Sequence, residues 1–349
     1  MTAGAVTAGA RGIAVEPLTT AAELEALRPE WTRLWHRAGG TPFQSPAWLL
    51  PWWRHFGRGE PLVLALRRTA GGELLGVAPF HTWTGDGDRR LLFIGTGNTD
   101  HLDALLHPDA AAEGAAAILA ELARHRDAWD ACDLQQLPAR SPLLAAPVPP
   151  SLRAATSVQD VCPVLPLPAP PAQLRDVLPR ARRRQLATAR NRAARLGSVC
   201  FEAADERTLP ELLEALVRLH GARWAQRDQT GVLADPVTRA FHAEAAAALL
   251  ALGALRLYAL RIDDRIVGVY HGLADRRRAY YYIGGFDPSY EAVSPGALLV
   301  AHALEQAARV GAGEFDFLRG REPYKYAWGA TDRPSYRRVL RHADQVAAG

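Results

Sequence analysis

The segment EFDFLRGREPYKYAWGA, residues 314–330, concentrates side chains that can transfer protons. Carboxylates accept protons, whereas phenols and ammonium groups donate them, so such residues suit general acid and base catalysis. The candidates in this segment are Asp316, Tyr324, Lys325 and Tyr326. The alternative is structural: Asp316, Arg319 and Lys325 form an ion-pair network, and the aromatic rings pack over it.

Two histidines are further candidates. His271 lies in a strand pattern over residues 266–273, where alternation puts it on one face with Val269 and Leu273. Imidazole titrates near neutral pH, so it is a common general base. His220 shares a helix face with Trp224. For both histidines the alternative is a hydrogen-bonded core residue.

A predicted strand, turn and helix start form a candidate phosphate site. The strand YYYIGGF (280–286) leads through DPSYEAV into a helix that begins SPGALLV. Ser294 can cap this helix, Pro295 suits its first position, and Gly296 leaves backbone N–H groups open to an anion. An ordinary capped helix is the alternative. Gly284 and Gly285 suit a strand that a ligand approaches closely, or a bulge.

An arginine-rich helix is predicted just before these elements. Residues 180–196 carry seven arginines and no acid, with an apolar stripe of Leu186, Ala189, Ala193 and Leu196. Its basic face suits nucleic acid, anionic lipid or the 3′-phosphate of a nucleotide cofactor; a solvated face is the simplest alternative.

Several familiar motifs are missing from the sequence. There is no GxSxG elbow and no GxxxxGK[ST] loop, which argues against the usual serine hydrolases and P-loop proteins. GTGNTD, from Gly95, lacks the third glycine of a dinucleotide fingerprint. Asp100, His101 and Asp103 form a short loop-like cluster, and the three cysteines are scattered, so we predict no metal site and no disulfide.

Composition places the chain among globular proteins. It has 349 residues, 48% hydrophobic and 22% charged, with a formal net charge of +4. No apolar run is long enough for a membrane span, and the first twelve residues do not resemble a signal peptide. We therefore predict a cytoplasmic protein with a loose tail over residues 1–12.

The elements that would position these residues fall into two similar halves. Proline-rich stretches between Pro138 and Pro179 suggest a boundary near residue 160, which gives domains over 13–160 and 161–349. PLVLALR, GELLGV and RLLFIGTG in the first half match LRLYALR, DRIVGV and AYYYIGGF in the second, pairing for instance Leu66 with Leu260 and Gly76 with Gly268. The sequence predicts two copies of a layered α/β domain, each a mixed, mostly antiparallel sheet flanked by helices.

Six stretches, in order over roughly residues 40 to 340, carry a resemblance to a known family: FQSPAWLLPWW, IGTGNTDHLDALL, RLHGARW, the helix with Phe241 and His242, GGFDP with SPGALL, and FDFLRGREPYKYAWGA. Together they resemble the CelD or BcsL acyltransferases of the GNAT superfamily, which are related to Fem-type peptidyl transferases. The resemblance implies tandem GNAT-like domains. It implies a working acyl-CoA site in the second domain and a non-catalytic first domain that shapes the acceptor cleft.

The resemblance also implies roles for individual residues. The strand that pairs with the pantetheine amides falls on Tyr282, Ile283, Gly284, Gly285 and Phe286. The diphosphate site falls on Ser294, Pro295, Gly296 and Ala297, where SPGA replaces the usual glycine-rich arginine loop. RLHGARW supplies the acceptor-site candidates His220, Arg223 and Trp224.

Proton transfer would then involve His271 and the polar residues of segment 314–330. His271 is the first candidate for the base and Asp316 the second, on strands expected to be adjacent. Tyr324 or Tyr326 would protonate the departing thiolate, and Lys325 would hold an acidic acceptor or the acyl carbonyl.

The resulting functional hypothesis is an acyltransferase that uses acetyl-CoA or another acyl-CoA as co-substrate, without a metal. It would transfer the acyl group to a small amine or an amino sugar by direct attack on the thioester. Two alternatives remain: a Fem-like transferase that uses aminoacyl-tRNA, with the arginine helix as phosphate track, and a non-catalytic binding module on the same fold.

Overall fold

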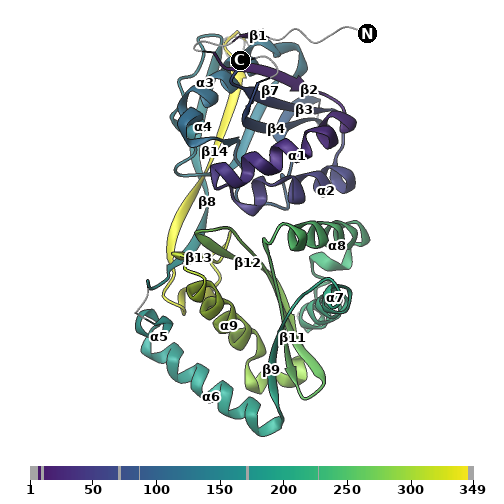
Figure 1. Cartoon of the computed structure of the whole chain (residues 1–349), viewed down its shortest axis with the longest axis vertical. Coiled ribbons are helices and arrows are strands. Elements are labelled where there is room, and N and C mark those ends of the chain that lie inside the picture. The colour runs from purple at the N-terminus through teal and green to yellow at the C-terminus, as the bar shows by residue number, and fades with distance from the viewer. Residues whose placement is uncertain are drawn as a thin grey trace. The chain divides into compact units, whose positions relative to one another are not determined.

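The chain folds into two compact units (Figure 1). The computed structural model describes residues 7–8, 12–69, 72–85, 87–169, 173–226 and 228–344. Unit 1 comprises Met1–Asp160 with Pro334–Gly349, and unit 2 comprises Val161–Arg333.

Unit 1 is a mixed sheet with helices between its strands. Its strands are β1 (Thr7–Ala8), β2 (Ala14–Leu18), β3 (Pro61–Arg67), β4 (Leu74–Gly85), β5 (Asp88–Phe93), β6 (Leu105–Leu106), β7 (Ala131–Pro138) and β14 (Thr331–His342). Its helices are α1 (Ala21–Ala38), α2 (Pro46–Phe56), α3 (Ala111–Arg124) and α4 (Pro142–Ala145). The order is β1-β2-β3-β4-β5-β7-β14, with β6 beside β4, and β5 runs parallel to β7.

Unit 2 repeats this arrangement. Its strands are β8 (Leu152–Pro166, which starts in unit 1), β9 (Val199–Ala203), β10 (Leu255–Ile262), β11 (Arg265–Ala274), β12 (Arg278–Phe286) and β13 (Glu314–Asp316). Its helices are α5 (Leu174–Val177), α6 (Arg180–Leu196), α7 (Leu209–Ala225), α8 (Pro236–Ala251), α9 (Pro295–Arg309) and α10 (Pro323–Tyr326). The order is β8-β13-β12-β11-β10-β9, and β12 runs parallel to β13.

The internal repeat extends to the pairing register. Leu66 pairs with Gly76 between β3 and β4, and Leu260 pairs with Gly268 between β10 and β11. In both hairpins the register shifts immediately after the leucine. Since two unrelated hairpins have no reason to share the position of a bulge, this match supports duplication. The predicted fold class, two layered α/β domains with mixed, mostly antiparallel sheets, is confirmed.

The last strand of the chain, β14, differs from the sequence-based division. Val164–Pro166 of β8 pair with β13 in unit 2, whereas β14, which follows α10, pairs with β7 in unit 1. Residues 161–349 therefore do not make one unit, because Pro334–Gly349 belong with unit 1. The pattern of a strand records which of its faces is buried but not which neighbour it pairs with, so the exchange could not be predicted.

The predicted tail over residues 1–12 lies mostly outside the described residues. Within it, Thr7–Ala8 form β1 and pair with β2. Within the described ranges no helix is both long and apolar enough to cross a bilayer. The cytoplasmic location stays a prediction.

The sheet of unit 2 has helices on both faces (Figure 1). Helix α7 packs on β11 and β12, while α9 packs on β10, β11 and β12 and is covered by α6. Leu186, Ala189 and Ala193, three members of the predicted stripe of α6, are buried in this core, and Leu196 is exposed. The basic face of α6 is thereby turned outward.

Helix α7 approaches β12 most closely at Gly285. A Cβ atom built on Gly285 would lie 2.3 Å from the backbone nitrogen of His220. This is far inside van der Waals contact, and backbone atoms cannot move away cheaply. Gly285 is therefore required by helix packing, which is a different reason from the ligand approach or bulge expected from the sequence.

We predict opposite effects for alanine at Gly285 and at Gly221, which lies in α7. Gly285→Ala should lower the free energy of unfolding by about 2 to 3 kcal/mol, since it over-packs the α7–β12 contact. Gly221 has open space around its Cβ position, so Gly221→Ala should raise stability by about 0.5 to 1 kcal/mol. Urea denaturation measures both. Equal midpoints for the two variants would contradict the close approach of α7.

Candidate functional site

A hollow of about 250 Å³ lies at the start of α9 in unit 2. Helix α9 supplies one wall and β12 another, with further side chains from α6, α7 and α10. The lining residues are Arg182, Arg223, Tyr281, Phe286, Glu291, Ser294, Pro295, Gly296, Ala297, Val300, Tyr324 and Trp328. We call this space the α9 hollow.

The α9 hollow lies where β12 and β13 part. The two strands pair over only three residues each, Arg278–Tyr280 with Glu314–Asp316. The next residue, Phe317, donates its amide to the carbonyl of Pro163 at 2.9 Å, so the chain after β13 follows β8. The remaining length of β12, residues 281–286, continues without β13. This separation leaves a strand edge open beside the start of α9.

A β-bulge decides which tyrosine faces the α9 hollow. His271 pairs with Ile283 and Gly272 pairs with Tyr281, so Tyr282 is an extra residue in β12. Regular alternation would send Tyr282 to the same side as Gly284. Instead Tyr281 lines the α9 hollow, whereas the Tyr282 ring lies 5.4 Å from that of His242 on the opposite face. Tyr281 was missed because strand periodicity carries no sign of a bulge.

Two arginines make the walls of the α9 hollow positive. The guanidinium of Arg182 stacks on Trp328 at 4.4 Å, and its Nε donates to the carbonyl of Ala327 at 3.3 Å. Arg223 lies over Phe286 at 5.3 Å. Stacking on aromatic rings fixes both guanidinium planes while it leaves N–H groups for a ligand. Apart from Glu291, the lining contains no acid, so the site suits an anion.

The first turn of α9 differs from the predicted cap. Ser294 occupies the N-cap position, but its side chain makes no capping hydrogen bond, and its φ of 51° is left-handed. Its carbonyl accepts the amides of Ala297 and Leu298. The amide of Gly296 has no acceptor within the described parts of the chain. That amide points from the positive end of α9 and is free for an anion.

Tyr281 and Tyr324 supply phenols to the α9 hollow. Their rings lie 6.2 Å apart, edge to face. Burial raises the pKa of Tyr281 and of Tyr324 above the usual value, and at Tyr281 the nearby Arg223 partly opposes the shift. Both phenols therefore stay neutral near pH 7 and can donate a proton or a hydrogen bond. A Cβ on Gly284 would lie 2.9 Å from the Tyr281 oxygen, so that hydroxyl covers the Gly284 backbone.

Three of the predicted catalytic residues, Lys325, Tyr326 and Asp316, do not line the α9 hollow. Lys325 is buried, and its Nζ donates to the carbonyls of Leu318, Arg319 and Gly320 at 3.0, 2.7 and 3.3 Å. Lys325 thus holds the loop before α10, and its ammonium has no donor left for substrate. Tyr326 donates to Asp332 at 2.7 Å, outside the α9 hollow.

Asp316 is also engaged within its own segment. It is fully buried, and Oδ1 accepts the amide of Leu318 at 2.8 Å. The expectation that Asp316 and His271 occupy adjacent strands is wrong, because β12 lies between β11 and β13. Neither residue lines the α9 hollow.

The histidines gather on the α7 face of the sheet. His271 and His242 are buried with ring centroids 5.7 Å apart, and burial lowers the pKa of His271 to about 4 and that of His242 to about 3. Neither ring nitrogen of His271 finds a hydrogen-bond partner among the described residues. His220 Nδ1 lies 3.2 Å from the carbonyl of Gly284, and its ring is 5.9 Å from Trp224. The sequence did not single out His242 as a site residue.

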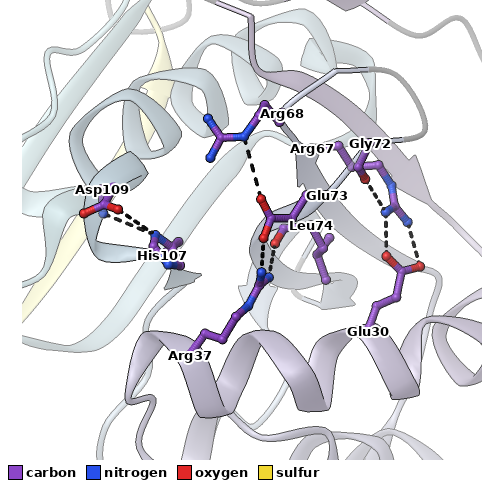
Figure 2. Close-up of polar contacts among 9 residues, drawn as sticks. All are labelled: Glu30, Arg37, Arg67, Arg68, Gly72, Glu73, Leu74, His107 and Asp109. Atoms are coloured by element: carbon purple, nitrogen blue, oxygen red, sulfur yellow. Dashed lines mark hydrogen bonds and ion pairs between the residues drawn. The ribbon is translucent and has the colours of Figure 1, made fainter.

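Unit 1 has a hollow of about 440 Å³, and both acids of its lining, Glu30 and Glu73, are paired with arginines (Figure 2). Glu73 pairs with Arg37 and Arg68, the latter at 3.7 Å. Glu30 accepts two hydrogen bonds from Arg67, at 2.8 and 3.2 Å. These pairs tie α1 to the β3–β4 hairpin.

The counterpart of α9 in unit 1 is α3, and its start is covered. A Cβ on Gly114 would lie 2.9 Å from the side chain of Leu106. The first turn carries Glu113, which disfavours an anion. The start of α3 therefore offers neither the space nor the charge found at α9.

Comparisons with known proteins agree with this geometry. Residues 180–326 match the family model described as an acetyltransferase (GNAT) domain. The matched segment contains α6 through α10 and every residue that lines the α9 hollow except Trp328. No curated protein sequence is detectably similar to the chain.

Several solved structures share the fold of the whole chain. FemX superposes with a TM-score of 0.66 at 12% identity, covering 95% of this chain and 98% of that one. A conserved protein of unknown function from Bacteroides thetaiotaomicron gives 0.60 at 12% identity, with 94% and 99% covered. The C-terminal domain of a protein described as a lysylphosphatidylglycerol synthetase from Agrobacterium fabrum gives 0.59 at 14% identity, with 94% of each chain covered. At such identities these similarities concern the fold alone.

A side chain that fills the α9 hollow should weaken ligand binding without lowering the stability of the protein. A Cβ on Gly296 would lie 3.6 Å from the Phe286 ring, so the position tolerates a side chain. Gly296→Glu places a carboxylate beside Arg182 and Arg223, where it should lower acetyl-CoA affinity at least about tenfold, since it blocks the anion and competes for the arginines. Calorimetry and thermal melting measure the two properties.

Gly296→Ala is the matched control and should keep binding. The melting temperature of Gly296→Glu should stay close to that of the unaltered protein, because an acid near a helix start is favourable. Undiminished acetyl-CoA binding by a folded Gly296→Glu variant would contradict the placement of the site.

Proposed function

We propose that unit 2 is an acyl-CoA-dependent N-acyltransferase that acts on a small amine or amino sugar. The observation that carries the proposal is the α9 hollow, where an open strand edge, an unused helix amide and two stacked arginines meet. The match of residues 180–326 to the acetyltransferase (GNAT) domain supports it. The narrower resemblance to CelD or BcsL stays a prediction.

The lining fits the chemistry of a coenzyme A thioester. The diphosphate would accept the amide of Gly296 and face Arg182 and Arg223. The pantetheine amides would pair with the edge of β12 over residues 281–286, as an added strand does. Pro295, Ala297 and the ring of Phe286 would contact the apolar parts of the chain. Tyr282, Ile283 and Gly285 would then contribute their backbone and not their side chains.

The reaction requires attack by a neutral amine on the thioester carbonyl. A carbon–nitrogen bond forms, the carbon–sulfur bond breaks, the amine loses a proton to a base, and the thiolate leaves or is protonated. Backbone amides of β12 near Gly284 would polarise the carbonyl. Tyr324 would protonate the thiolate, because its phenol is neutral and lines the α9 hollow, whereas Tyr326 is held by Asp332.

For the base we propose His271 over Asp316. The carboxylate of Asp316 already accepts a backbone amide, while His271 has two ring nitrogens without partners among the described residues and stays neutral at physiological pH. His271 lies on the α7 face together with His220 and Trp224, the predicted acceptor residues. The acceptor would accordingly approach β12 from that face. Unit 1 would be non-catalytic, in line with the covered start of α3.

A Fem-like aminoacyl transferase is the second candidate. The similarity to FemX over the full chain supports it. Against it, the longest described helices of unit 2, α6 and α7, have 17 residues each, so the unit has no long helical arm within its described residues. A non-catalytic binding module is the third.

Ligand binding distinguishes the three candidates. Acetyl-CoA should raise the melting temperature, with a gain of about 2.7 kcal/mol when its concentration is one hundred times Kd. A radiolabelled acetyl group should then appear on an amine acceptor from a panel of amines and amino sugars. Retention of tRNA with steep salt dependence, without any effect of acetyl-CoA, would favour the Fem-like candidate. Binding of acetyl-CoA without transfer to any acceptor or to water would favour the binding module.

Substitutions should separate proton transfer from binding. Tyr324→Phe should lower kcat about tenfold, a modest effect because the thiol of coenzyme A leaves readily. His271→Ala should lower kcat about 10²-fold. The matched control Tyr326→Phe should leave kcat unchanged, since Tyr326 contacts Asp332 and not the α9 hollow. Steady-state kinetics measures kcat for each variant, and calorimetry measures its acetyl-CoA binding in parallel. Equal kcat values for Tyr324→Phe and Tyr326→Phe would remove Tyr324 from the mechanism.

A further inference from the structure

A second hollow, of about 600 Å³, adjoins the α9 hollow. It runs between α6 and the start of α9, and we call it the α6 groove. Arg182, Ser294 and Ala297 line both spaces, so the two lie side by side. Its further polar lining comes from Arg184, Gln185, Thr188 and Arg192.

Among the described residues, no acid forms an ion pair with Arg182, Arg184 or Arg192, so the positive charge of the α6 groove is not neutralised there. No acid lines it, and the lining of the adjoining hollow contains one acid, Glu291. Arg190, which is paired with Glu305 at 2.6 Å, does not line the groove. Arg184 makes no ion pair or side-chain hydrogen bond within the described chain.

Two of the three groove arginines are held in place by contacts within unit 2. Arg192 donates Nη1 to the carbonyl of Ala292 at 3.1 Å, which anchors it to the turn before α9. Arg182 is fixed by Trp328 and by the carbonyl of Ala327, both through contacts that leave its terminal nitrogens unused. Arg184 lies between these two residues in the sequence of α6 and lines the same groove. The guanidinium groups of Arg182 and Arg192 are therefore positioned before any ligand arrives, and together with Arg184 they suit a dianion that accepts several charge-assisted hydrogen bonds.

We propose that the α6 groove binds the 3′-phosphate at the nucleotide end of coenzyme A and so selects free acyl-CoA over donors that lack this phosphate. The inference rests on the proposed function, because it extends the same bound donor beyond the α9 hollow. Because the two spaces adjoin and share three lining residues, a ligand bound in the α9 hollow can extend over these residues into the groove. The donor specificity of the enzyme then depends on a helix that lies outside the sheet.

The same geometry argues against a nucleic-acid track. Arg180, Arg183 and Arg195, which would extend a line of phosphate contacts along α6, do not line the groove. Only three arginines line the groove, which matches one phosphate group better than a strand of them. Binding of tRNA through this groove is therefore the competing outcome, and the experiment below includes it.

The test compares coenzyme A with 3′-dephospho-coenzyme A by calorimetry on the full chain. The unaltered protein should bind coenzyme A about tenfold or more tightly than the dephospho form, since charge-assisted hydrogen bonds to the phosphate are lost in the latter. Arg184→Gln should weaken coenzyme A about tenfold and leave the dephospho form unchanged. Arg183→Gln removes the same charge from the neighbouring position and should preserve the difference between the two ligands.

The outcomes separate this inference from the proposed function. If the unaltered protein binds neither ligand, the acyl-CoA proposal fails and the inference fails with it. If it binds both equally, or if Arg183→Gln and Arg184→Gln behave alike, the 3′-phosphate assignment is wrong while the acyl-CoA proposal stands. If tRNA binds and Arg184→Gln releases it without affecting coenzyme A, the groove serves nucleic acid and the inference is overturned.

Discussion

The parting of β12 from β13 is the constraint on which the candidate site depends. The strands share three paired residues, after which Phe317 bonds to β8 and the chain turns away. Lys325 stabilises this course, because its ammonium is buried among three loop carbonyls and pairs with Glu322 at 2.9 Å. A buried charge is costly unless it is satisfied in this way. Without the turn, β13 would continue along β12 and close the edge that borders the α9 hollow.

β12 separates two chemical environments. One face of the strand, with Tyr281, meets neutral phenols and arginines, and the other, with Tyr282, meets buried histidines of low pKa. The bulge at Tyr282 creates this division, since it sends two consecutive tyrosines to opposite environments. Gly284 and Gly285 allow close contacts on the two faces of β12. Gly285 admits the backbone of α7, while Gly284 lies beneath the hydroxyl of Tyr281.

Local patterns predicted a large part of this site, and contacts between distant segments account for what they missed. The helix start at Ser294–Ala297, Phe286, Arg223 and Tyr324 follow from motifs and do line the α9 hollow. The bulge that selects Tyr281 arises from pairing between β11 and β12, which no single strand records. Lys325 and Tyr326 have the residue types of catalytic groups, but their partners Leu318 and Asp332 were invisible in the sequence pattern. The repeat predicted the sheets of both units, but it did not predict that β14 pairs with β7 or that β8 pairs with β13.

The two units show that duplicating a fold does not duplicate a site. Both have antiparallel strands followed by one parallel pair, and both place a helix before the last of these strands. At α3 the first turn carries Glu113 and is covered by Leu106, whereas the first turn of α9 carries no acid and has an open amide at Gly296. Unit 2 also has α6 before its first antiparallel strand, β9, where the described residues of unit 1 before β2 include only β1. The difference in chemistry thus comes from a first turn and an added basic helix, while the shared sheet supplies the position at which they act.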